Sequence, residues 1–136
     1  MWLFTPTGFL SVVDKGDRTD DGKVLLCVRA RYKEDLADIL QYLDSADDSK
    51  TPKILDSEVM RDPYYDYRFR IFVRKLDFMT YMATVVNRIN YDNFKDRCAE
   101  LDSPHSTKER LGVLSDIWLT QYHAAREFDW KYKEFI

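Results

Sequence analysis

The chain has 136 residues, of which 45% are hydrophobic and 15% aromatic. This length is typical of a single domain. Because the chain has only four glycines and four prolines, its composition is not that of a low-complexity or disordered protein. The formal net charge of −3 excludes the overall positive charge typical of nucleic-acid-binding proteins, but it is compatible with a local basic patch. We therefore expect a single folded domain over residues 1–136.

The N-terminal segment predicts a pair of strands. Residues 2–5 and 9–13 are rich in strand-forming residue types, and they flank the turn residues Pro6 and Gly8. A polar, aspartate-rich loop is expected over residues 14–23.

Two longer strands are predicted to carry arginines at alternate positions. Residues 23–31 have the sequence KVLLCVRAR, and residues 66–74 have the sequence DYRFRIFVR. Because successive side chains of a strand point to opposite faces, each strand is expected to pack one apolar face and to present arginines on the other. The arginines nearest each other in this arrangement are Arg29, Arg31, Arg68 and Arg70.

The remaining elements follow from helical spacing of apolar residues and from start signals. A weaker strand is predicted at residues 53–59, with a turn at 61–65. Helices are predicted over residues 33–43, 76–90 and 91–101, and from Ser103 onward. In the last helix five side chains are expected to point inward: Leu111, Leu114, Ile117, Trp118 and Tyr122.

This order predicts an α+β fold, in which an antiparallel sheet has helices packed on one face and the C-terminal half is helical. A ferredoxin-like topology is the nearest common architecture, with the N-terminal hairpin in place of the usual last strand. Residues 127–136 alternate Phe128, Trp130 and Tyr132 with charged residues. They either continue the last helix or form a C-terminal arm, and exposed aromatics there would indicate contact with a partner.

Several spaced motifs resemble those of a family of small uncharacterised bacterial and phage proteins. These motifs are the opening MWLFTPTGFLSVV, then VRARYKEDL, DYRFRIFV and INYDNFKD, in that order. The resemblance spans residues 1 to about 122 and implies a shared fold and a shared surface. It implies no catalytic residue, because the family carries no assigned activity.

The arginines form the candidate ligand-binding site, together with Tyr67. Like charges on neighbouring strands repel, so the cluster must be balanced by carboxylates or by a bound anion. Asp66, Asp92 or acids of the C-terminal helices are the internal candidates. An anionic ligand, an acidic protein partner and plain solvent exposure are the other possibilities. Four aromatics near the arginines favour single-stranded RNA among the ligands: Tyr64, Tyr65, Tyr67 and Phe72.

No catalytic constellation, metal-binding spacing or phosphate-binding glycine loop is visible, so we expect neither an enzyme nor a cofactor. A pairing of Cys98 with His123 is the one nucleophilic arrangement left open. Cys27 and Cys98 fit no disulfide framework, and no segment has the pattern of a signal peptide or a membrane span. These features predict a cytoplasmic protein with reduced thiols and no membrane association.

The leading functional hypothesis is a non-enzymatic binding or regulatory protein that acts through a protein partner or through self-association. Its partner contacts are expected at Phe128, Trp130 and Tyr132, because tyrosine and tryptophan are typical anchors of interfaces. A phage-encoded inhibitor of a host system would be one such protein. The alternative hypothesis is binding of a nucleotide or of single-stranded RNA through the arginine-bearing sheet face.

Overall fold

The computed structural model describes residues 1–45, 59–101 and 107–132, with side chains up to residue 128. Contacts between residues group the chain into two compact units, residues 1–91 and 92–136, and each is described by itself. The predicted single domain stays a prediction.

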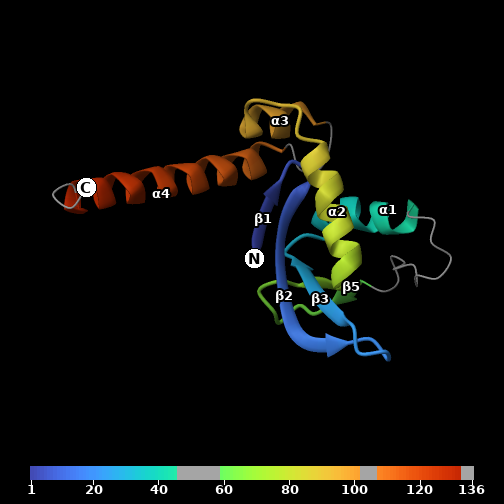
Figure 1. The fold of residues 1–136 in the computed structure, drawn as a ribbon. Helices are drawn as coiled ribbons and strands as arrows, with labels where there is room; N and C mark the ends of the chain where they lie inside the picture. The colour runs from blue at the N-terminus through green and yellow to red at the C-terminus, as the bar shows by residue number, and fades with distance from the viewer. Residues whose placement is uncertain (46–58, 102–106, 133–136) are drawn as a thin grey trace. The chain divides into compact units, whose positions relative to one another are not determined.

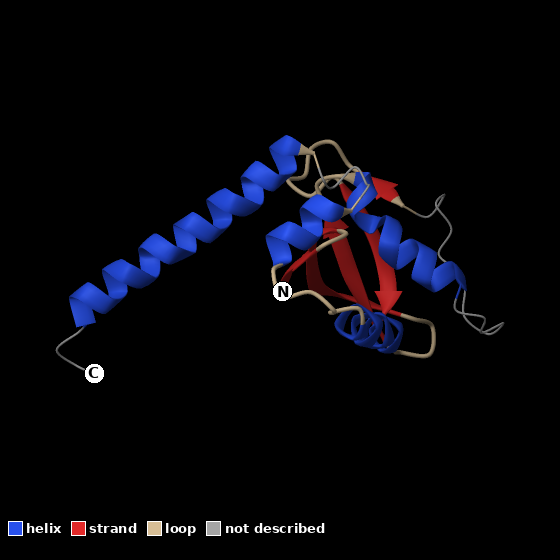
Figure 2. Cartoon of the chain, turned by 90° about the horizontal axis from the view of Figure 1, so that it is seen from above, coloured by secondary structure: helices blue, strands red, loops and turns tan. Residues whose placement is uncertain are grey.

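One antiparallel sheet of five strands forms the first unit, which confirms the α+β class (Figures 1 and 2). The strand order is β1-β2-β3-β5-β4, and this order does not confirm a ferredoxin-like topology. The strands are β1 (Trp2–Thr5), β2 (Gly8–Arg18), β3 (Val24–Ala30), β4 (Met60–Arg61) and β5 (Phe69–Arg74).

Three helical segments complete this unit, and two helices make up the other. A 3-10 turn, η1 (Lys33–Leu36), leads directly into α1 (Ala37–Ser45), and α2 (Lys75–Asn87) follows β5. Figure 1 shows α1 and α2 on the same side of the strands. The second unit contains α3 (Phe94–Glu100) and α4 (Lys108–Tyr132).

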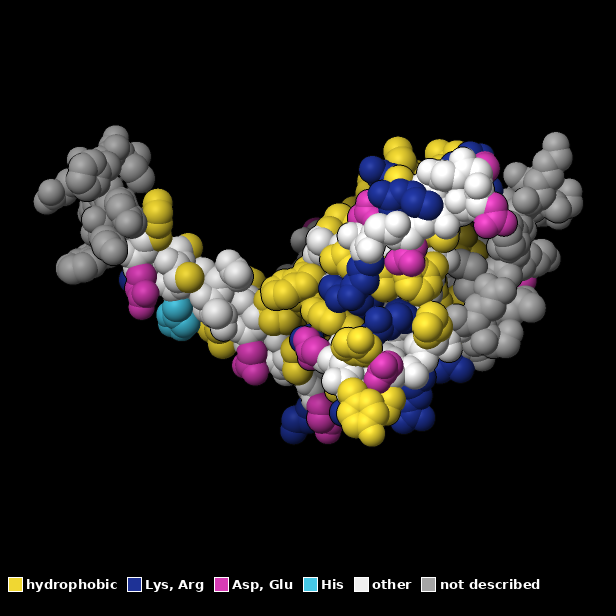
Figure 3. All heavy atoms as spheres, turned by 90° about the horizontal axis from the view of Figure 1, so that it is seen from below, with side chains coloured by type: hydrophobic (Ala, Val, Ile, Leu, Met, Phe, Trp, Pro, Cys, Tyr) yellow, Lys and Arg dark blue, Asp and Glu magenta, His cyan; other side chains and the backbone are white. Residues whose placement is uncertain are grey.

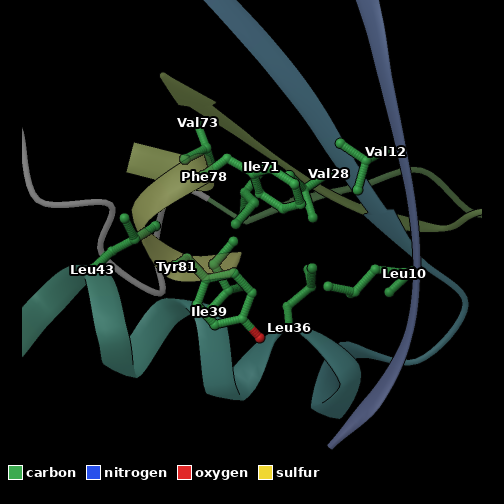
Figure 4. Close-up of a cluster of buried hydrophobic side chains, with 11 residues drawn as sticks. Leu10, Val12, Val28, Leu36, Ile39, Leu43, Ile71, Val73, Phe78 and Tyr81 are labelled. Atoms are coloured by element: carbon green, nitrogen blue, oxygen red, sulfur yellow. The ribbon is translucent and has the colours of Figure 1, made fainter. Parts of the chain in front are cut away.

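The hydrophobic core lies between the sheet and these helices, and its side chains point toward one another (Figure 4). Val28 and Ala30 of β3 and Ile71 and Val73 of β5 are buried there, as the alternation of the sequence predicts. The helices contribute Leu36, Ile39, Leu43, Phe78 and Tyr81. Since all the helices of this unit pack on one face, no described helix of residues 1–91 covers the opposite face.

Two predicted boundaries are wrong. The loop expected at residues 14–23 begins only after Arg18, because β2 keeps pairing with β3 through the polar segment, with a register shift between Asp14 and Arg18. Gly16 lies within that shift at a φ of 93°, a conformation that favours glycine. The helix expected from residue 33 begins as a 3-10 turn. Most of the strand predicted at 53–59 lies outside the described residues.

Gly8 is required where β2 begins. Its φ of 152° is one that L side chains rarely adopt, and a Cβ atom there would lie 2.9 Å from the Cα of Asp35. The close approach places η1 against the start of β2. Because Gly8 has no side chain, the N-terminal hairpin can pack closely against η1, the first turn of the helical layer.

The side chain of Asn93 caps the start of α3. Asn93 accepts a hydrogen bond through its side chain from the backbone N–H of Asp96. Phe94 begins the helix, and Cys98 is buried. The motif YDNFKD thus serves as a helix start in the second unit.

Candidate functional site

The sheet face opposite α1 and α2, called the arginine face below, carries the candidate site. The side chains that alternate with the core residues of the strands are Trp2, Phe4, Phe9, Ser11, Cys27, Arg29, Arg70 and Phe72. Tyr65, Asp66 and Tyr67 join them from the loop before β5, through contacts with arginine side chains. A space-filling view shows basic side chains among hydrophobic ones, with single acidic side chains beside them (Figure 3).

Arg29 and Arg70 are directly opposite each other on β3 and β5. The register continues this row across the sheet, from Trp2 through Ser11, Arg29 and Arg70 to Met60. Neighbouring strands lie ~4.8 Å apart, so the row spans about 19 Å, with the two cations adjacent within it. The sequence-based expectation that these two strands are neighbours is confirmed.

The two guanidinium groups make few polar contacts. Nη2 of Arg29 donates to Oγ of Ser11 at 2.7 Å, and Nη2 of Arg70 donates to the carbonyl oxygen of Tyr67 at 3.4 Å. The Nε atoms of both arginines are shielded from solvent and donate to no described residue. Within the described part of residues 1–91, no carboxylate forms a hydrogen bond or ion pair with either group, and the charge of Arg29 interacts only at longer range with Asp66, whose pKa it helps to lower.

Tyrosine rings hold both guanidinium groups in place. The Cζ atom of Arg29 lies 4.8 Å from the centre of the Tyr67 ring, and that of Arg70 lies 4.4 Å from the centre of the Tyr65 ring. Such cation–π contacts stabilise by about 0.5–2 kcal/mol. Tyr67 is only 8% exposed, so it supports arginines and presents little surface of its own, whereas Tyr65 is one of the exposed residues.

Arg31 is balanced internally, by one of the carboxylates that the sequence suggested. Its Nε and Nη2 donate to the two oxygens of Asp66 at 3.1 and 2.9 Å, and this bidentate contact lowers the pKa of Asp66. Arg31 also lies 4.6 Å from the ring centre of Tyr67. The internal explanation therefore holds for Arg31, and it does not extend to Arg29 and Arg70.

Arg68 is exposed, and no hydrogen bond or ion pair joins its side chain to another described residue. The structure thus brings together Arg29, Arg31, Arg70 and Tyr67 of the predicted site, while Arg68 stays apart from these contacts.

The N-terminal aromatic residues of the arginine face, Trp2, Phe4 and Phe9, were missed by sequence reasoning. Phe9 stacks on Phe4 with ring centres 4.5 Å apart, and it also contacts Trp2 and Tyr67. Trp2 is 68% exposed at the end of the central row. The alternation of Phe9, Ser11 and Val13 with the buried Leu10 and Val12 is the signal that places these side chains opposite the core.

The predicted partner-binding residues lie on α4, which continues as one helix through Tyr132. Phe128 is exposed. The side chains of Trp130 and Tyr132 lie outside the described residues. Trp118 and Tyr122 were expected to point inward, but they are 52% and 43% exposed and stack on each other at 5.3 Å. Among the described residues of its own unit, α4 packs against the short α3, which is too short to cover its aromatic side chains.

The other chemical alternatives find no support in the described residues. Cys98 is buried, which raises the pKa of its thiol, and no hydrogen bond joins it to His123 in the part of the chain that the structure describes. No group of three or more His, Cys, Asp or Glu side chains could hold a metal ion among residues 1–45, 59–101 and 107–132. Across the same residues, no helix has the length and apolar character for crossing a membrane.

Comparison of the chain with known protein families, with curated proteins and with solved structures finds no match. The likeness to the family of small bacterial and phage proteins therefore stays a resemblance of motifs. The functional argument depends on the arginine face itself.

Proposed function

We propose that this protein is a non-enzymatic binding protein and that it binds nucleotides or single-stranded nucleic acid on its arginine face. One observation carries the proposal: Arg29 and Arg70 are directly opposite each other, and no carboxylate of the described part of residues 1–91 contacts either of them. The overall acidic charge does not oppose this, since the face is locally basic.

The pair is unfavourable in the absence of an anion. Like charges directly opposite on neighbouring strands destabilise a sheet, by a few tenths of a kcal/mol up to about 1 kcal/mol. A bound phosphate converts this repulsion into two favourable contacts, because the planar guanidinium group matches phosphate oxygens with paired N–H donors. The free protein therefore holds two charges that a phosphate would balance.

Exposed aromatic rings lie on both sides of the arginine pair. Trp2 ends the row on β1, and Tyr65, which is 55% exposed, lies on Arg70. Stacking of a base on an aromatic side chain stabilises binding by about 1–3 kcal/mol per base. Binding of single-stranded nucleic acid requires positively charged groups beside exposed aromatic rings, and the arginine face has both.

Fluorescence anisotropy with a mixed-sequence single-stranded RNA tests the proposal. We expect binding at 50 mM salt that weakens steeply at 200 mM, because phosphate contacts release counterions. Arg29→Gln and Arg70→Gln should each weaken binding at least tenfold. Arg61→Gln is the matched control, since Arg61 pairs with Phe69 of the core-facing set and lies off the arginine face. Absence of binding at 50 mM salt, both of the RNA and of a nucleotide added as its competitor, would refute the proposal.

A second candidate, binding of a protein partner or of a second copy of the chain, is favoured by a different observation. The stacked Trp118 and Tyr122 and the exposed Phe128 place large aromatic surface on α4. Light scattering over a dilution series should then show a mass above that of the monomer, which falls to the monomer mass in Trp118→Ala. A monomer at every concentration would exclude self-association. Action as a phage-encoded inhibitor would require a heterologous partner for this surface.

We also propose a ferredoxin-like topology for the sheet of the first unit. A ferredoxin-like arrangement, with β2 in place of the usual last strand, is supported by the position of β5 between β3 and β4. In a sheet of this kind the face opposite the helices is available for a ligand, which is where the arginine pair lies.

A further inference from the structure

We infer that Arg29 and Arg70 together bind a single phosphate monoester, so that the preferred ligand carries a terminal phosphate. This inference depends on the proposed nucleotide or nucleic-acid binding and narrows it. A free nucleoside monophosphate and the phosphorylated 5′ end of a strand share the required chemistry, and the experiment below separates them.

The charge of the pair favours a monoester over the other common anions. Two adjacent guanidinium groups carry two positive charges, whereas a carboxylate or an internal phosphodiester carries one negative charge. A phosphate monoester carries about −1.5 to −2 at neutral pH. Of these three groups, the monoester alone balances both arginines.

The remaining N–H donors of Arg29 and Arg70 also favour a phosphate monoester. Each guanidinium group has five N–H donors, and Arg29 and Arg70 each donate a single hydrogen bond to the residues that the structure describes. A terminal phosphate offers three acceptor oxygens, one more than a carboxylate. The two shielded Nε–H groups have no acceptor among the described residues, so their dipoles add to the positive potential that an anion experiences at this point.

The two groups are also positioned before any ligand binds. Arg29 is held by the hydroxyl of Ser11 and the ring of Tyr67, and Arg70 is held by the ring of Tyr65. Less side-chain freedom is therefore lost on binding, which favours affinity. The exposed side of Tyr65 is available for the base or sugar attached to the phosphate.

The surroundings disfavour a long strand that passes across the face. The next arginine, Arg31, already holds Asp66 in a bidentate contact, so it does not offer a second unpaired cation to a following phosphate. The Asp66 carboxylate would also repel an anion that approached Arg31. The face therefore offers one anion site at the pair, and not a continuous track for a phosphate backbone.

Three ligand pairs test the inference on the full chain. One is a 3′-labelled single-stranded heptanucleotide with a 5′-phosphate or a 5′-hydroxyl. The second is AMP or adenosine as the competitor of the labelled strand, and the third is AMP or 3′,5′-cyclic AMP, whose phosphate is a diester. We expect the 5′-phosphate to improve affinity at least tenfold, and AMP to compete where adenosine and the cyclic nucleotide do not.

The outcomes separate the two proposals. Equal affinity for the two strand ends, together with no competition by AMP, overturns the monoester site but does not exclude nucleic-acid binding, whereas no binding of any strand or nucleotide overturns both. Competition by AMP with no preference for the 5′-phosphorylated strand assigns the site to free nucleotides and supports the inference. Arg29→Gln should remove the preference, Arg29→Lys should keep part of it, and Arg61→Gln should leave it unchanged.

The wild-type protein offers a second readout that needs no variant. The second pKa of a phosphate monoester is about 6, so the preference for the 5′-phosphate should fall about fourfold from pH 7.5 to pH 5.5. The groups that face the pair are Arg31, Asp66, Tyr65, Tyr67 and Cys27, with Lys15 and Asp17 farther along the strands. Because Arg31 lowers the pKa of Asp66 and burial raises that of Cys27, neither changes its charge in this interval. A preference that stays constant with pH would contradict the inference.

Discussion

Arg29 and Arg70 occupy directly opposite positions on β3 and β5, and each is held by a different tyrosine ring. Structural salt bridges place opposite charges together, whereas this pair places like charges together. A sheet that retains such a pair gives up stability that an apolar pair would supply. We interpret the arrangement as a property of a binding site, and its energetic signature can be measured without a ligand.

A double-mutant cycle should detect the repulsion between the two arginines. If Arg29→Gln and Arg70→Gln each relieve the same unfavourable contact, the double variant relieves it only once. Its loss of unfolding free energy should exceed the sum of the single losses by about 0.2–1 kcal/mol in low salt. Urea unfolding of the four proteins provides the values. Additivity, or a coupling of opposite sign, would mean that another group already balances the pair.

The start of β2 should not tolerate a side chain. Gly8→Ala forces a rarely adopted φ and places a Cβ atom 2.9 Å from the backbone of Asp35, so we expect a loss of about 1–3 kcal/mol in unfolding free energy. Gly112→Ala is the contrasting substitution. It lies within α4 and a Cβ there meets no atom within 4 Å, so helix propensity should stabilise α4 by up to about 1 kcal/mol. Chemical denaturation and amide hydrogen exchange measure the two effects.

The hydroxyl of Tyr81 should contribute to stability through its contact with α1. It donates to Oδ2 of Asp38 at 2.9 Å, and Arg88 also donates to that carboxylate. Tyr81→Phe keeps the buried ring and removes this bond to a charged acceptor, which should cost about 1–3 kcal/mol. Tyr42→Phe is the control, because its ring neighbours Tyr81 but its hydroxyl donates to no described residue. Equal losses in the two variants would attribute the effect to packing.

The contact between Arg31 and Asp66 predicts a measurable titration. Its hydrogen bonds lower the pKa of Asp66 below the value of the unfolded chain. The stabilising contribution is therefore present above the unfolded pKa and is lost as the pH falls through the folded pKa. NMR titration of the Asp66 carboxyl should give a pKa below about 3.9 that rises in Arg31→Gln and stays unchanged in Arg61→Gln.

Both partners of that contact are largely exposed, with 45% and 69% of their side-chain surfaces accessible. Added salt should therefore reduce the shift, because counterions screen exposed charges. A shift that persists in 0.5 M NaCl would indicate that the hydrogen bonds, and not the charges, dominate.

Local regularities in the sequence determined which face of each strand would be buried. In β3 and β5 the apolar residues recur with a period of two, and this period matches the pleat of any strand. The burial of Val28 and Ile71 and the outward position of Arg29 and Arg70 follow from that spacing alone. The cap at Asn93 is equally local, since donor and acceptor lie three residues apart.

Only the tertiary structure decided which side chains meet. The register that sets Arg29 opposite Arg70 joins residues 41 positions apart, and no local pattern specifies it. The same pairing extended β2 into a polar segment, because a strand that has a partner can continue through residues of weak strand propensity. For the same reason Asp66 binds Arg31 and forms no hydrogen bond with Arg29 or Arg70, since long-range strand pairing, and not residue type, selects the neighbours of a charge.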